Sequence, residues 1–171
     1  RYLWGFPCDD CNAATNPSSA LEDEWMGYTW SEPVVTRVRV RSDGLANSVG
    51  FERWVAILSG GYEATGDPND ADSYDPTAIA GRTILMIDIA SGKPIAMKRF
   101  DLAATDAQAY MQYAIPSTPG VLDLDFDGFA DVVYVGDLGG QVFKWVINAI
   151  GEDRVNDTSA EGPVALSSFR A

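Results

Sequence analysis

The chain has 171 residues, of which 46% are hydrophobic, 11% aromatic and 22% charged, which excludes a disordered tail or a fibre and fits one or two globular domains. Twelve Lys and Arg residues against 25 Asp and Glu residues give a formal net charge of -13, so the surface should repel nucleic acid and anionic lipid. Because the chain contains no histidine, the usual general base and the usual nitrogen ligand for zinc or copper are missing. Any metal chemistry must therefore use oxygen ligands.

Short apolar runs with a period of two residues predict β-strands along most of the chain. These runs lie at 34–40, 54–58, 83–89, 132–135 and 142–147. Only the alanine-rich segment 101–113 has a helix-favouring composition, and it is short. No apolar run approaches the ~18 residues of a membrane span. We therefore expect a mainly β protein with room for one short helix and with no membrane span.

The two halves of the chain repeat the same order of segments, which indicates a repeated structural unit. Ser-Glu-Pro-Val-Val at 31–35 recurs as Ser-Thr-Pro-Gly-Val at 117–121, and two apolar runs follow in each half before a closing segment at 94–100 or 163–169. Four strands per unit is the anatomy of a propeller blade. The sequence thus predicts part of a β-propeller: about two four-stranded blades, with residues 1–6 as the remnant of another.

The predicted organisation follows from this repeat. The expected units are the end of a preceding blade with a connecting loop at 1–30, a blade-like unit at 31–100 with a long loop at 63–80, a connector at 101–116, and a second blade-like unit at 117–171. A propeller closes with at least about four blades, and the chain starts at Arg1 without an apolar leader. We therefore expect a processed product or a piece of a longer chain, or ends that other chains cover.

The acidic excess is concentrated in three segments without Lys or Arg, at 8–24, 63–75 and 121–137, each of which carries five acids. The third contains the pattern D-x-D-x-D-G-x-x-D. Its oxygen donors, in the spacing of a calcium loop with Gly at position six, are the carboxylates of Asp123, Asp125, Asp127 and Asp131 and the backbone carbonyl of Phe129. Four carboxylates in nine residues repel one another unless a cation lies among them. We expect calcium rather than magnesium, since magnesium demands a tighter octahedron; an acidic turn that only solvates the chain is the alternative.

Three further features leave alternatives open. Cys8 and Cys11 are separated by two residues, Asp9 and Asp10, which favours a small structural disulfide in an exported protein, with two unpaired thiols as the alternative. The acidic stretch at 67–75 lacks a correctly placed Gly, so a solvated loop is favoured over a second, weak calcium site. Arg37, Arg39 and Arg41 lie on one strand face, either as its wet side or as a stripe that docks onto a neighbouring acidic loop.

Several of these segments resemble the C-terminal propeller of the type IV pilus tip-associated PilC/PilY family. The resemblance runs through Gly-Tyr-Thr-Trp-Ser-Glu-Pro-Val-Val at 27–35, Arg-Trp-Val-Ala-Ile-Leu-Ser-Gly-Gly-Tyr at 53–62 and, most specifically, 123–145. It implies an exported, non-enzymatic protein at the cell surface, pilus tip or outer membrane, which acts in pilus assembly, adhesion and twitching motility. Its implied partners are the rest of a longer propeller chain, minor pilin subunits and a host or surface receptor, and its implied cofactor is calcium at Asp123, Asp125, Asp127 and Asp131.

Two other classes of protein fit part of the pattern. An exported quinoprotein-type dehydrogenase is also a propeller with calcium, but it needs an axial cofactor pocket assembled from several blades. Such enzymes often carry two adjacent cysteines, whereas Cys8 and Cys11 have two residues between them. A purely structural calcium-stapled propeller would have the same loop without a role in piliation. Without histidine, Ser/His and Cys/His catalytic arrangements are impossible.

Overall fold

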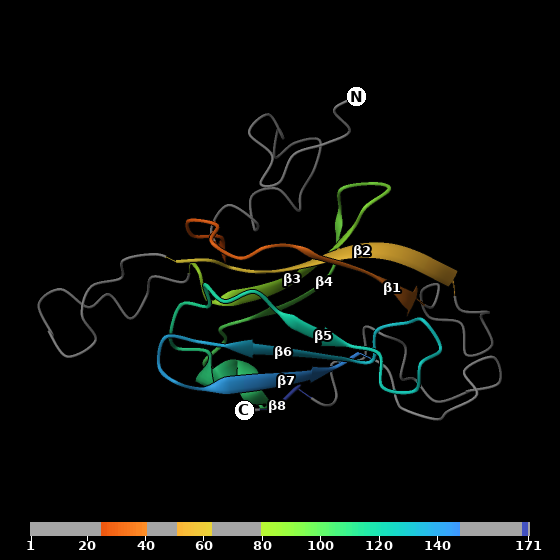
Figure 1. Ribbon diagram of the computed structural model, residues 1–171. Helices are drawn as coiled ribbons and strands as arrows, with labels where there is room; N and C mark the ends of the chain where they lie inside the picture. Colours follow the sequence, from red (N-terminus) through yellow and green to blue (C-terminus); the bar gives the residue numbers. More distant parts are fainter. Residues whose placement is uncertain (1–24, 41–50, 63–79, 148–168, 171) are drawn as a thin grey trace, which may run out of the picture.

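In a computed structural model, which describes residues 25–40, 51–62, 80–147 and 169–170, the strands form two four-stranded antiparallel sheets (Figure 1). The first sheet has the order β1-β2-β3-β4, with β1 at Val34–Val40, β2 at Phe51–Ser59, β3 at Thr83–Asp88 and β4 at Pro94–Arg99. The second sheet has the order β5-β6-β7-β8, with β5 at Gly120–Leu122, β6 at Val132–Gly136, β7 at Val142–Val146 and β8 at Phe169–Arg170. Sequential strands pair in both sheets, so the mainly β, blade-like prediction is confirmed.

Strand pairing is antiparallel in both sheets. In the first sheet Val34 pairs with Ile57 and Val38 with Arg53, while the register between β3 and β4 shifts at Met86/Ile87. In the second sheet Leu122 pairs with Val132. This last pair places the residues that follow β5 beside those that precede β6, and so closes the base of the intervening loop.

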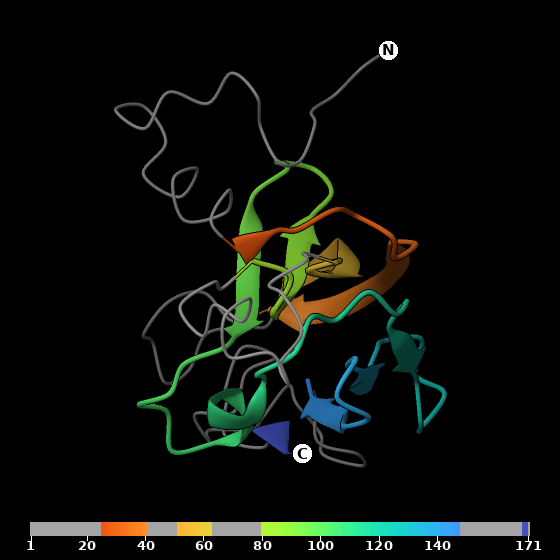
Figure 2. The same cartoon turned by 90° about the vertical axis from the view of Figure 1, so that its left-hand side faces the viewer.

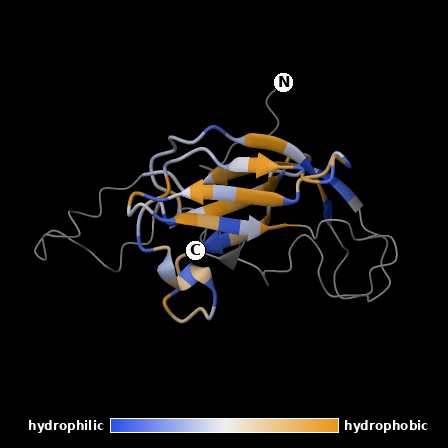
Figure 3. Ribbon diagram, turned by 60° about the horizontal axis from the view of Figure 1, so that its bottom comes forward, coloured by the Kyte–Doolittle hydropathy of each residue, from blue (hydrophilic) through white to orange (hydrophobic). Residues whose placement is uncertain are grey.

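The two sheets share one hydrophobic core. All six residues of β3 are buried, because its two faces pack against different clusters. Ile84 and Met86 belong to the cluster that also holds Phe143 and Trp145 of β7, whereas Leu85 packs on the other face of the first sheet. Figure 3 shows hydrophobic, orange segments along strands of both sheets.

The connector between the sheets holds one short helix. This 3-10 helix, η1, spans Ala107–Tyr110 and has Asp106 as its N-cap, whose side chain accepts a hydrogen bond from the Gln108 N–H. Figure 2 shows η1 beside β8 of the second sheet. The helix-favouring stretch at 101–113 thus yields four helical residues, because Asp106 caps a single turn and Met111, buried in the shared core, leaves the helix.

Backbone hydrogen bonds join the two halves at the end of β2. The N–H of Gly61 donates to the Ile115 carbonyl (3.0 Å), and the N–H of Ile115 donates to the Gly81 carbonyl (2.8 Å). Gly61 has a φ of 86°, and a Cβ there would collide with the Tyr28 carbonyl. The predicted blade remnant at 1–6, Cys8, Cys11, Arg41 and most of the loop at 63–80 lie outside the described residues.

Candidate metal centre

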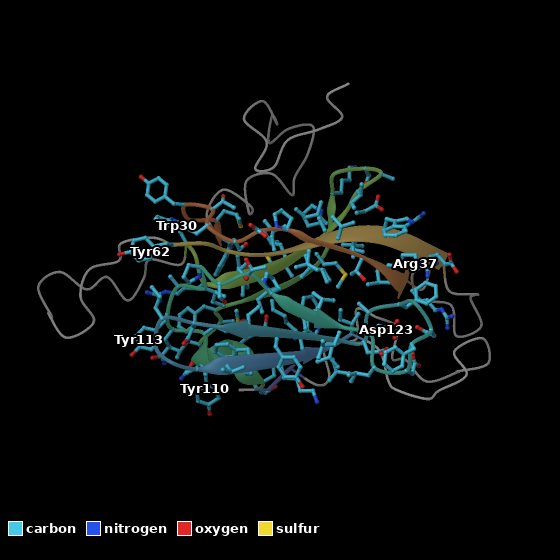
Figure 4. The ribbon with its side chains drawn as sticks, in the orientation of Figure 1. Trp30, Arg37, Tyr62, Tyr110, Tyr113 and Asp123 are labelled. Carbon is cyan, nitrogen blue, oxygen red and sulfur yellow. The ribbon has the colours of Figure 1, made fainter. Side chains whose placement is uncertain are left out.

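The acidic loop connects β5 to β6 at one end of the second sheet. Asp123 follows Leu122 directly and Asp131 precedes Val132, so the Leu122–Val132 pair holds the two carboxylates at the base of the loop. The N–H of Asp131 donates to the Leu122 carbonyl at 2.8 Å. In Figure 4 Asp123 and Arg37 lie at the same end of the molecule, Arg37 on the first sheet and Asp123 below it.

Three of the predicted ligands converge. Carboxylate oxygens of Asp123, Asp125 and Asp131 all lie within 4.8 Å of one another. Asp131 is fully buried and its Oδ2 accepts a hydrogen bond from the Leu124 N–H (2.7 Å). The Oδ2 of Asp123 accepts from the Gly128 N–H (2.8 Å), which folds the loop back over its own base.

The other two predicted ligands are the Asp127 carboxylate and the Phe129 carbonyl. Asp127 lies outside the group of three; its Oδ1 accepts from the Phe129 N–H (2.9 Å) and its Oδ2 lies 3.6 Å from an Arg39 nitrogen. Phe129 is buried, with its ring beneath two arginines. Its carbonyl oxygen stays a predicted ligand.

The turn at the loop tip requires two residues in the left-handed region. Phe126 has a φ of 62° and is 91% exposed, and Gly128 has a φ of 85°. Positive φ is uncommon outside glycine, so Phe126 holds a backbone conformation that few side chains adopt. Gly128 occupies position six, where the calcium-loop pattern places its glycine.

Two arginines of β1 hold the loop against the first sheet. The Arg37 Nε donates to the Gly128 carbonyl at 3.2 Å, and the Ala130 N–H donates to the Arg37 carbonyl at 2.8 Å. The guanidinium of Arg37 lies 4.8 Å from the centroid of the Phe129 ring and 5.8 Å from that of Trp54, while the guanidinium of Arg39 lies 4.3 Å from the Phe129 centroid. The predicted stripe that docks onto an acidic loop is therefore observed for Arg37 and Arg39.

The donors fit a hard divalent cation. Three carboxylates at such short range repel one another unless a cation compensates them, and calcium is bound by oxygen ligands of this kind. The Oδ1 of Asp123 is buried and accepts no hydrogen bond within the described residues. A buried acceptor without a partner is costly, so this oxygen is available to a ligand.

The fold and the loop together define the class of the protein: a propeller-type β domain with an acidic loop between the first two strands of a blade. A family model described as the PilY1 beta-propeller domain matches residues 1–171, and the chain belongs to this family. Its relatives include the type IV pilus biogenesis factor PilY1 of Pseudomonas aeruginosa strain UCBPP-PA14, 29% identical over 86% of this chain, and a PilY1 homolog of Xylella fastidiosa, 31% identical over 77% of it.

The chain spans only a small part of these proteins, 11% of the Pseudomonas relative and 7% of the Xylella relative. Among solved structures, the C-terminal domain of Pseudomonas aeruginosa PilY1 is 25% identical with a TM-score of 0.49, covering 86% of this chain and 25% of that one. Within the described residues no helix is long and apolar enough to cross a membrane.

Proposed function

We propose that this chain is a calcium-binding propeller segment of a type IV pilus biogenesis protein that acts at the cell surface, at the pilus tip or outer membrane. The observation that carries the metal assignment is the convergence of the Asp123, Asp125 and Asp131 carboxylates, together with a buried Asp123 Oδ1 that has no hydrogen-bond partner among the described residues. Asp127 and the Phe129 carbonyl complete the proposed ligand set. Bound calcium would supply the charge that offsets the clustered carboxylates.

The proposed role is assembly and adhesion, not catalysis. Relatives of this chain are named as type IV pilus biogenesis factors, which supports a role in pilus assembly; adhesion and twitching motility are proposed with it. The proposed partners are the remaining blades of a longer chain, minor pilin subunits at the pilus tip and a host or surface receptor, with export through the periplasm.

Calcium binding is tested by thermal unfolding of the chain in excess calcium and in chelator. A ligand that binds only the folded state stabilises it by about 2.7 kcal/mol at a hundredfold excess over Kd, so we expect a higher Tm with calcium. Asp125→Asn removes one charge from an exposed ligand and should weaken binding about tenfold, because affinity depends on the number of charged ligands. Glu32→Gln, an exposed acid outside the loop, is the matched control. Equal melting of the wild type in both conditions would contradict the assignment.

The pilus role is tested in the full-length protein with Asp125→Ala. We expect fewer surface pili and reduced twitching at unchanged protein level, measured by pilus shear preparations and stab assays. Normal piliation with lost calcium binding would indicate a purely structural calcium staple. Binding of pyrroloquinoline quinone to the full-length protein would instead favour the dehydrogenase alternative.

A further inference from the structure

The side chain of Asp127 faces the first sheet instead of the carboxylate triad. Its Oδ2 lies 3.6 Å from a guanidinium nitrogen of Arg39, and the two side chains are 28% and 31% exposed. Its Oδ1 accepts the Phe129 N–H. Both oxygens are therefore engaged by groups outside the carboxylate triad.

Arg37 and Arg39 contact the loop in different ways. Arg37 donates its Nε to a backbone carbonyl, that of Gly128, and stacks near two aromatic rings. Arg39 also lies over the Phe129 ring, but its ion pair is with an acid of the loop itself. The guanidinium of Arg39 is thus paired with the Asp127 carboxylate, which a cation bound in the loop would also attract.

We propose that Arg39 is a built-in counter-ion of the acidic loop, which holds Asp127 away from the triad and competes with a divalent cation for it. This inference rests on the proposed calcium site and assigns a residue that sets its affinity. Arg39 is a positioning residue, since it acts on the metal through Asp127.

The proposal predicts two opposite effects of removing the Arg39 charge. Calcium affinity rises, because Asp127 no longer has a competing partner and the repulsion between the guanidinium and the cation is gone. Stability in chelator falls, because four acids then share the loop without this counter-charge. A residue that merely supports the loop's shape would instead lower the affinity when removed.

The experiment is isothermal titration of the chain with calcium chloride, comparing the wild type with Arg39→Gln. We expect an affinity about three- to tenfold higher, the size expected for losing a partly exposed ion pair and one like-charge repulsion. Lys93→Gln makes the same charge change at an exposed position in the β3–β4 turn and should change the affinity less than about twofold, since solvent and salt screen distant charges. In an Asp127→Asn background, Arg39→Gln should lose most of its effect.

Each outcome has a defined meaning. If the wild type binds calcium and Arg39→Gln binds it with equal or lower affinity, the inference is overturned while the proposed calcium site stands. Equal gains in Arg39→Gln and Lys93→Gln also overturn it, because they would reflect net charge only. A wild type that gives no calcium heat and no calcium-dependent Tm overturns the proposed site and the inference with it.

Discussion

At the scale of single residues, Gly128 combines two requirements in the acidic loop. Its φ of 85° disfavours any side chain, and a Cβ there would collide with the Arg37 guanidinium. Gly128→Ala should therefore strain the backbone and also displace Arg37 from its carbonyl partner. We expect a loss of about 2–3 kcal/mol in the free energy of unfolding, from the left-handed strain and the broken contact together.

Gly140 provides the matched control for this prediction. Its φ is 80°, yet a Cβ there would have no heavy atom within 4 Å. Gly140→Ala should cost only the backbone strain, about 1–2 kcal/mol. Urea unfolding of both variants separates the cost of backbone strain from that of the lost Arg37 contact. Equal losses of unfolding free energy in the two variants would show that the Arg37 contact contributes nothing.

Sequence could identify the members of the loop but not all of their contacts. The D-x-D-x-D-G-x-x-D spacing depends on neighbours in the chain, which is why Asp123, Asp125 and Asp131 could be predicted together. The orientation of Asp127 depends on Arg39, 88 residues earlier in the sequence (127 minus 39). The alternation of Arg37 and Arg39 placed them on one strand face, but only the packing of the sheets shows which acidic segment they meet.

At the scale of elements, most strands and the one short helix were predictable, although the bounds of the helix were not. Period-two runs fixed β1 at its observed bounds, Val34–Val40. Three-residue β5, Gly120–Leu122, is too short to show a period of its own and was indicated only by the repeat. The alanine content at 101–113 favours helix, but tertiary contacts limit it to η1, since Met111 leaves the helix to enter the shared core.

The cap of η1 is also a charged link to the first sheet. The Lys98 ammonium of β4 has a fully buried side chain and lies 3.1 Å from Asp106 Oδ2. Burial raises the pKa of Asp106, but hydrogen bonds from Gln108 and Lys98 outweigh it, so the pKa lies below its ordinary value. Burial lowers the pKa of Lys98, and Asp106 offsets this only in part. The helix cap and the buried cation therefore share one carboxylate.

Asp106→Asn should lower the free energy of unfolding at pH 7 by about 2 kcal/mol, because a charge-assisted hydrogen bond is lost and the cap is weakened. A carboxyl with a depressed folded-state pKa stabilises the fold above its unfolded pKa, and this is lost as the pH falls through the folded pKa. The difference in unfolding free energy between the wild type and Asp106→Asn should thus shrink below about pH 4. Urea unfolding at a series of pH values from 7 to 2.5 measures this difference.

Asp101→Asn serves as the control for this pH dependence. Asp101 is exposed, and its Oδ1 accepts only a local backbone hydrogen bond from Ala103 among the contacts described. We expect a change below about 0.5 kcal/mol. A pH-independent difference for Asp106→Asn would contradict the role assigned to its charge.

At the scale of the whole molecule, the acidic loop lies where two sheets meet and is held by both. Its ends continue into β5 and β6 of the second sheet, while Arg37 and Arg39 reach it from the first. The two sheets also share a core, in which β3 and β7 contribute to one cluster. The geometry of the loop therefore depends on the relative position of the sheets, and cation binding should stabilise both together.

Phe143→Ala tests whether the two sheets unfold as one unit. Phe143 of β7 is fully buried in the cluster that includes Ile84 and Met86 of β3. Removing a buried Phe costs about 3–5 kcal/mol, and in a single cooperative unit every slowly exchanging amide loses the same free energy. We therefore expect hydrogen exchange to accelerate equally in β3 and in β6. Val142→Ala, at the exposed neighbour on the same strand (61% exposed), should change both by less than about 0.5 kcal/mol. Faster exchange confined to the second sheet would show that the two sheets unfold independently and that the loop contacts of Arg37 and Arg39 do not couple them.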